Sequence, residues 1–215
     1  MTRTIPEADL AGPRRTGPRL TRLHLMSRQV PGALTVLACC AALLWIVLHT
    51  HWIRGDDHAA DQQILLLIED GAASVVAVAA RNPFGESERT TGRLLPLLRL
   101  GAALLLSAAA VGALVLGAVA GRLPGGWFEM LRDVAGLAGA GLITAAAVGG
   151  ALAWTGPLAY TVVAEFALME DWQTPWMWPA RPAHDLGAWL CAGLAFAAGT
   201  AVIAARGPRE TGGDS

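Results

Sequence analysis

The sequence predicts an all-α protein, a polytopic membrane helical bundle with about six transmembrane helices and cytoplasmic N and C termini. Composition is the first observation behind this fold class, because the chain is 54% hydrophobic and 15% charged, against about 25% charged in ordinary soluble domains. The second is a series of apolar stretches long enough to cross about 30 Å of hydrocarbon at about 1.5 Å per residue. The third is an uneven distribution of arginine, which favours one side of such a bundle.

The segment before the first apolar stretch divides into two parts. Residues 1–18 combine Pro, Gly, Thr and Arg with few apolar side chains, which predicts a disordered cytoplasmic tail. Residues 19–30 place Leu20, Leu23 and Met26 at helical spacing, with arginines on the other faces. This pattern predicts an amphipathic helix in the headgroup layer of the membrane, and a solvated basic segment is the alternative.

A six-span transmembrane domain is predicted for residues 31–205, followed by a polar cytoplasmic tail, residues 206–215. The fourth span is rich in Gly and Ala, which indicates a tight packing face between helices. Before the last span, residues 170–185 hold three Trp and three Pro, which suits short re-entrant or surface-lying pieces near the membrane–water boundary. The predicted spans are residues 32–50, 62–80, 97–121, 130–154, 157–172 and 186–205.

Three carboxylic side chains fall inside predicted spans. Glu69 and Asp70 lie in the middle of the second span, and Glu165 lies in the fifth. An ionised carboxylate in the bilayer costs several kcal/mol unless it faces the bundle interior or water. We therefore expect these three intramembrane polar residues to face protein. The alternative is that residues 62–80 form a peripheral helix and the chain has fewer spans.

The arginines orient the predicted spans. All 16 Lys-or-Arg positions are Arg. With six spans, twelve of them fall on the side of both termini and four, Arg54, Arg122, Arg132 and Arg181, on the other side. This division follows the positive-inside rule. Removing the second span would move the central loop and its arginines to the outside.

Several classes of chemistry lack the residues that they need. Without lysine, a nucleotide-hydrolysing phosphate loop and Schiff-base catalysis are excluded. The loop 49–61 holds three His and three Asp, but without a recognised metal-ligand spacing, so a polar exit loop is preferred to a metal site. We expect no catalytic, cofactor-binding or metal site in this chain. Nucleic-acid binding has no support beyond the basic tail.

The loop after the second span, residues 81–99, has a distinctive order of residues. It reads Glu86, Glu88, Arg89, Gly92, Leu94, Leu95, Pro96 and Arg99. Together with the order of spans and the Trp- and Pro-rich segment before the last span, this loop resembles that of the permease subunits of type-2 ATP-binding-cassette exporters.

The resemblance implies that Glu86, Glu88, Arg89, Gly92 and Arg93 dock a separate cytoplasmic ATPase. ATP would be bound and hydrolysed by that partner, so this chain would hold no cofactor and would not itself be an enzyme. A second permease copy, identical or not, would complete the transporter in a bacterial cytoplasmic membrane.

Three other functions stay open from the residues alone. An ion- or proton-coupled small carrier would use Glu69, Asp70 and Glu165 as titrating groups. A membrane enzyme would combine these carboxylates with the histidines of the loop 49–61. A non-transporting membrane anchor or assembly subunit would use only the packing faces of the helices.

Overall fold

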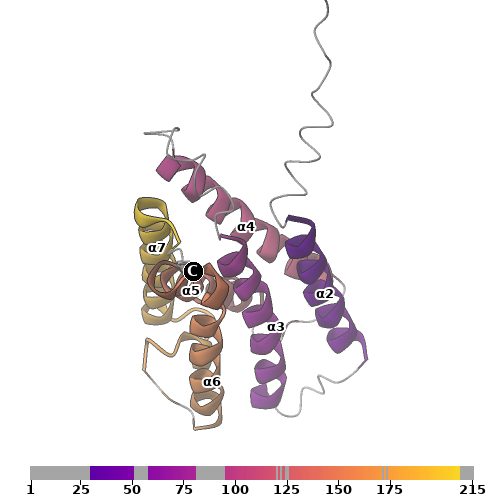
Figure 1. The fold of residues 1–215 in the computed structure, drawn as a ribbon. Coiled ribbons are helices and arrows are strands. Elements are labelled where there is room, and N and C mark those ends of the chain that lie inside the picture. Colours follow the sequence, from indigo (N-terminus) through magenta and orange to yellow (C-terminus); the bar gives the residue numbers. More distant parts are fainter. Residues whose placement is uncertain are drawn as a thin grey trace, which may run out of the picture.

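A computed structural model describes residues 30–50, 58–80, 95–119, 121, 123, 126–170, 172 and 174–208. Within these ranges the chain is helical, without strands, and six helices are long and apolar enough to cross a membrane. This confirms the predicted all-α, multi-pass class (Figure 1). The helices are α2 (Val30–His49), α3 (His58–Ala79), α4 (Leu95–Ala118), α5 (Gly126–Val148), α6 (Thr155–Met169) and α7 (Leu186–Arg206), with short 3-10 helices η3 (Gly150–Leu152) and η4 (Trp178–Ala180).

One end of the bundle, here called the loop end, holds one terminus of each of the six long helices. These are the starts of α2, α4 and α6 and the ends of α3, α5 and α7. A buried cluster there joins Ala77 near the end of α3, Ala103 near the start of α4 and Ile203 near the end of α7. The start of α2, the end of α3 and Trp154 before α6 line one apolar hollow of about 550 Å³. Helix α3 ends and helix α4 begins at this end.

The opposite end, here called the hairpin end, carries the segment between α6 and α7, residues 170–185, which is called the hairpin below. Gln62 near the start of α3 donates hydrogen bonds to Glu129 at the start of α5 and to the Pro179 carbonyl of η4. Successive helices therefore run in alternating directions, and α2 begins at the same end at which α7 finishes. Since α3 packs against α2, α5 and α6, it lies inside the bundle.

Helix α5 is the centre of the packing, and its glycines allow the close approach. A Cβ atom at Gly139 would lie 2.4 Å from the Ala195 backbone of α7, and one at Gly199 would lie 2.5 Å from the Gly139 carbonyl oxygen. In the same way, a Cβ atom at Gly117 of α4 would lie 2.4 Å from the Ala41 carbonyl oxygen of α2. Small residues thus form the helix–helix contacts, as the Gly-rich spans predicted.

The boundary between the fourth and fifth long helices, α5 and α6, lies at a different residue from the predicted one. Helix α5 ends at Val148, six residues before the predicted end at residue 154, because Gly149 adopts a φ of 105° that ends the helix. Pro157 lies in the first turn of α6. A proline is tolerated there, since the amide hydrogens of the first turn have no partner within the helix.

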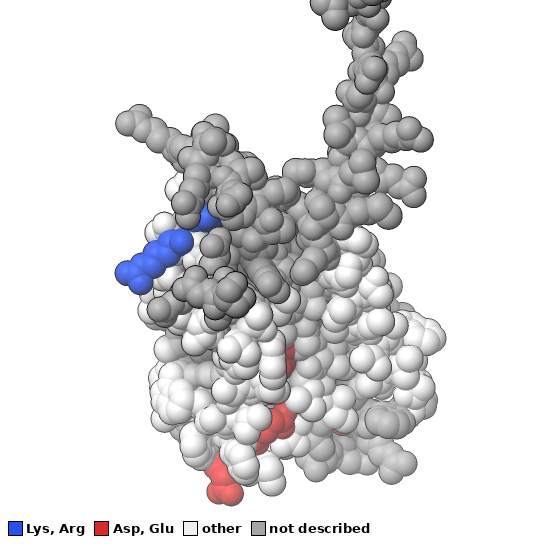
Figure 2. Space-filling view, in the orientation of Figure 1, with Lys and Arg blue, Asp and Glu red and all other residues white. Residues whose placement is uncertain are grey.

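The sides of the bundle carry little charge. In Figure 2 the described surface is mostly free of Lys, Arg, Asp and Glu, with the visible basic side chains toward the loop end and the visible acidic ones toward the other end. Large apolar side chains such as Leu105, Leu116 and Leu190 are exposed there, as expected of a surface that faces lipid.

Candidate functional site

A cluster of charged side chains is buried at the hairpin end of the bundle. Arg132 and Asp133 lie three and four residues after Glu129 in the first turns of α5, so each of them shares a helix face with Glu129. All three are buried, and Arg132 is 0% exposed. Arg132 was predicted among the four arginines on the side opposite the termini, and Glu129 and Asp133 were not among the predicted site residues.

Arg132 joins α5 to the hairpin that precedes α7. Its Nε atom donates to Asp133 Oδ1 at 2.9 Å, and its Nη1 atom donates to the Arg181 and Pro182 carbonyl oxygens, each at 3.0 Å. Its Nη2 atom lies 4.0 Å from Glu129 Oε1 and has no hydrogen-bond partner within the described structure. The guanidinium therefore pairs closely with one carboxylate and fixes the backbone of the hairpin.

Glu69 approaches the same cluster from α3. Its side chain is 6% exposed, and its charged neighbours are Asp133, Glu129 and Arg132. Glu69, Glu129, Asp133 and Gln62 line a small cavity of about 20 Å³, which is enough for about one water molecule. The structure thus brings one predicted site residue together with two acidic residues that the sequence analysis missed.

Asp70 and Glu165, the other two predicted intramembrane acids, lie elsewhere. Asp70 is buried against α6, where it faces Thr161. The Glu165 side chain is half-buried, and in the described ranges its Oε1 atom has no hydrogen-bond partner. The charged groups that act on Glu69 are Asp133, Glu129 and Arg132, and neither Asp70 nor Glu165 is among them. The three acids therefore do not form one site.

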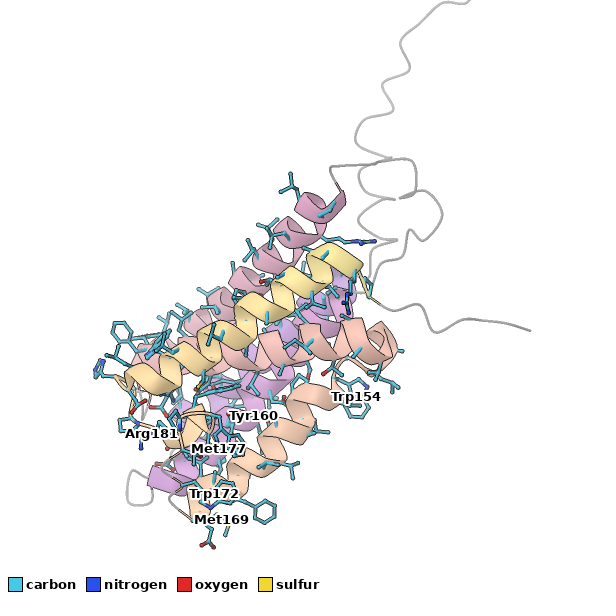
Figure 3. All side chains as sticks on the ribbon, turned by 90° about the vertical axis from the view of Figure 1, so that its left-hand side faces the viewer. Trp154, Tyr160, Met169, Trp172, Met177 and Arg181 are labelled. Carbon is cyan, nitrogen blue, oxygen red and sulfur yellow. The ribbon has the colours of Figure 1, made fainter. Side chains whose placement is uncertain are left out.

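The hairpin is held in place by aromatic and polar contacts, seen in Figure 3 around Tyr160, Met177 and Arg181. Tyr160 stacks on Trp178 with ring centroids 4.2 Å apart and donates a hydrogen bond to the Trp176 carbonyl oxygen at 2.7 Å. Exposed Trp172 and Trp176 lie at this end and Trp154 at the other. Tryptophans at both ends suit the two membrane–water boundaries.

Asp185 fixes the point at which the hairpin becomes α7. Its carboxylate accepts a hydrogen bond from the Ala188 amide and pairs with Arg181 at 2.5 Å. The Ala188 amide, followed by the Arg181 guanidinium, holds the pKa of Asp185 below its usual range. Its stabilising contribution is therefore present at neutral pH and is lost only as the pH falls through that lowered value.

Several predicted features lie outside the described residues. They are the tail 1–18, the interfacial helix up to residue 29, the loop residues 51–57, the last tail residues 209–215 and the proposed docking residues Glu86, Glu88, Arg89, Gly92 and Arg93. Within the described ranges, no group of three or more His, Cys, Asp or Glu is arranged to hold a metal ion.

Comparison with protein-family models, with curated proteins and with solved structures found no match for this chain. Its function is therefore argued from its own residues and geometry.

Proposed function

We propose that this chain is the membrane-spanning permease subunit of an ATP-driven exporter in a bacterial cytoplasmic membrane. A separate ATPase would dock on residues 81–99 and would carry out the hydrolysis of ATP. The observation that carries this proposal is the alternation of the six helices. It supports a position of the loop 81–94 at the same end of the bundle as the start of α2 and the end of α7.

The charges at that end favour a cytoplasmic loop. Arg99 and the end of α7 lie together, since a Cβ atom at Gly207 would lie 2.7 Å from the Arg99 guanidinium. The chain adds Arg81, Arg89 and Arg93 in the connecting loop. An excess of arginine on one side is typical of the cytoplasmic face, where an ATPase could reach the loop.

A second permease copy is part of this proposal. The cavity beside Glu69, about 20 Å³, is far too small to admit a substrate, and the larger hollow of about 550 Å³ at the loop end is open to the surface and lined mostly by apolar side chains. A substrate pathway formed between two permease copies would not depend on the size of a cavity within one chain. Helix movements driven by the ATPase would then open and close the space between them.

Exchange of the loop charges tests the docking. Glu88→Arg combined with Arg89→Glu is expected to lower the ATPase activity of the purified complex by about tenfold, which corresponds to about 1.4 kcal/mol of lost docking free energy. The matched control is Glu170→Arg, an exposed residue at the hairpin end, which is expected to leave the activity unchanged. An affinity-purified chain that brings no ATPase, or a double variant with native activity, would contradict the proposal.

A second candidate, a proton-coupled small carrier, is favoured by one observation, the burial of Glu69 with Glu129 and Asp133. Such a carrier would transport its substrate in liposomes without any ATPase, and the rate would depend on a pH gradient. Transport by the isolated chain would therefore decide for the carrier and against the exporter subunit.

A further inference from the structure

Glu69 is a buried acid without a partner of its own. Within the described part of the chain, its carboxyl group forms no hydrogen bond and no close ion pair. The residue is nevertheless only 6% exposed, and is therefore 94% buried. It borders the small cavity of about 20 Å³, which Glu129 and Asp133 line from α5. A polar side chain in this position needs a ligand, because burying an unpaired polar or charged group is costly.

The cluster contains more carboxyl groups than its single guanidinium can neutralise. Arg132 lies 2.9 Å from Asp133 but 4.0 Å from Glu129, and its Nη1 atom is occupied by two hairpin carbonyls. In the part of the chain that the structure describes, Glu69 forms no ion pair. Tyr160 of α6 lies near Asp133, Arg132 and Cys191 of α7, and neither Tyr160 nor Cys191 supplies a positive charge. Among the described residues, Glu129 therefore has Arg132 only at 4.0 Å together with a hydrogen bond from Gln62, and Glu69 has no ion-pair partner.

The arrangement of the cluster indicates which kind of ligand would neutralise its excess of negative charge. A metal ion needs several ligands directed at one point, and the described residues offer no such group. A proton needs only one carboxyl oxygen. The cavity has room for about one water molecule in contact with the polar side chains that line it, and such a water could pass a proton between them.

We propose that Glu69 and Glu129 form a proton-binding site in which each holds one proton, with a single water in the cavity between them and Asp133. Each proton taken from solvent converts one carboxylate into a carboxylic acid, and its release reverses that step. Asp133 stays ionised as the partner of Arg132. This site does not depend on the docking of an ATPase and would exist in either candidate function.

Infrared spectroscopy of the purified full-length protein in lipid at pH 7 tests the site directly. The native protein is expected to show the carbonyl band of buried carboxylic acids. Glu69→Gln should remove the intensity of one acid, and Glu69→Gln with Glu129→Gln should remove a second, equal amount. Glu170→Gln, an exposed control, should leave the band unchanged. An unchanged band in the double variant would overturn the proposal.

The native protein alone also decides the question if the variants do not fold. Raising the pH should convert the acid band into carboxylate bands with the release of two protons per chain. Replacing choline chloride with sodium chloride at constant pH should have no effect. The absence of an acid band at pH 7 would show that no proton occupies the site, and its loss on addition of sodium would show that the site prefers a metal ion to protons; either result would overturn the proposal.

Discussion

Replacing Arg132 with methionine is expected to reduce the free energy of unfolding by about 3–5 kcal/mol, the usual cost of breaking a buried ion pair. Methionine keeps most of the side-chain volume but leaves buried Asp133 without its cation at 2.9 Å. It also leaves the Arg181 and Pro182 carbonyl oxygens without their donor. Equilibrium unfolding in mixed micelles measures the loss.

Two further variants separate the ion pair from other effects of the Arg132 substitution. Arg206→Met, at the exposed end of α7, is expected to change stability by less than about 0.5 kcal/mol. Adding Asp133→Leu to Arg132→Met should recover part of the loss, because it removes the uncompensated carboxylate. A native-like stability of Arg132→Met would mean that the cluster does not hold the hairpin in place.

The second large effect is expected at the contact between α5 and α7. Gly199→Ala should destabilise the bundle by about 1–3 kcal/mol, as overpacking does, because the new Cβ atom would lie 2.5 Å from the Gly139 carbonyl oxygen. A backbone atom cannot move aside as a flexible side chain can, so the two helices must separate. Thermal unfolding in detergent measures this loss.

The matched control is Gly193→Ala, on the same helix, where a Cβ atom meets nothing within 4 Å. This substitution should be neutral or stabilising by up to about 1 kcal/mol, since alanine favours a helix more than glycine does. Equal effects of the two substitutions would contradict the close approach of α5 and α7.

The spans could be predicted because each is a local property of the sequence. Apolar runs of sufficient length marked the six helices, and the two acids in the second span, Glu69 and Asp70, were expected to face protein. Their side chains leave α3 about 100° apart, and the structure buries Glu69 against α5 and Asp70 against α6. The end of α5 was misplaced because a glycine at positive φ, Gly149, leaves no clear hydropathy signal.

The charged cluster could not be predicted, because it depends on the packing of distant segments. Glu69 and Asp133 are 64 positions apart in the sequence, and nothing local indicates that α3 lies beside the start of α5. The spacing of Glu129, Arg132 and Asp133 did contain a signal, since residues three and four apart share one helix face. A charged face at the start of an apolar span needs partners within the protein.

The proposed function requires the loop 81–94 to face the cytoplasm, and cysteine labelling tests this orientation. Ser87→Cys is introduced into a variant whose Cys39, Cys40 and Cys191 are replaced by alanine, and intact cells are treated with a membrane-impermeant maleimide. We expect Ser87→Cys to react only after permeabilisation, and Thr174→Cys, at the exposed hairpin, to react from outside. Labelling of Ser87→Cys in intact cells would place the loop outside the cell, where no ATPase can dock.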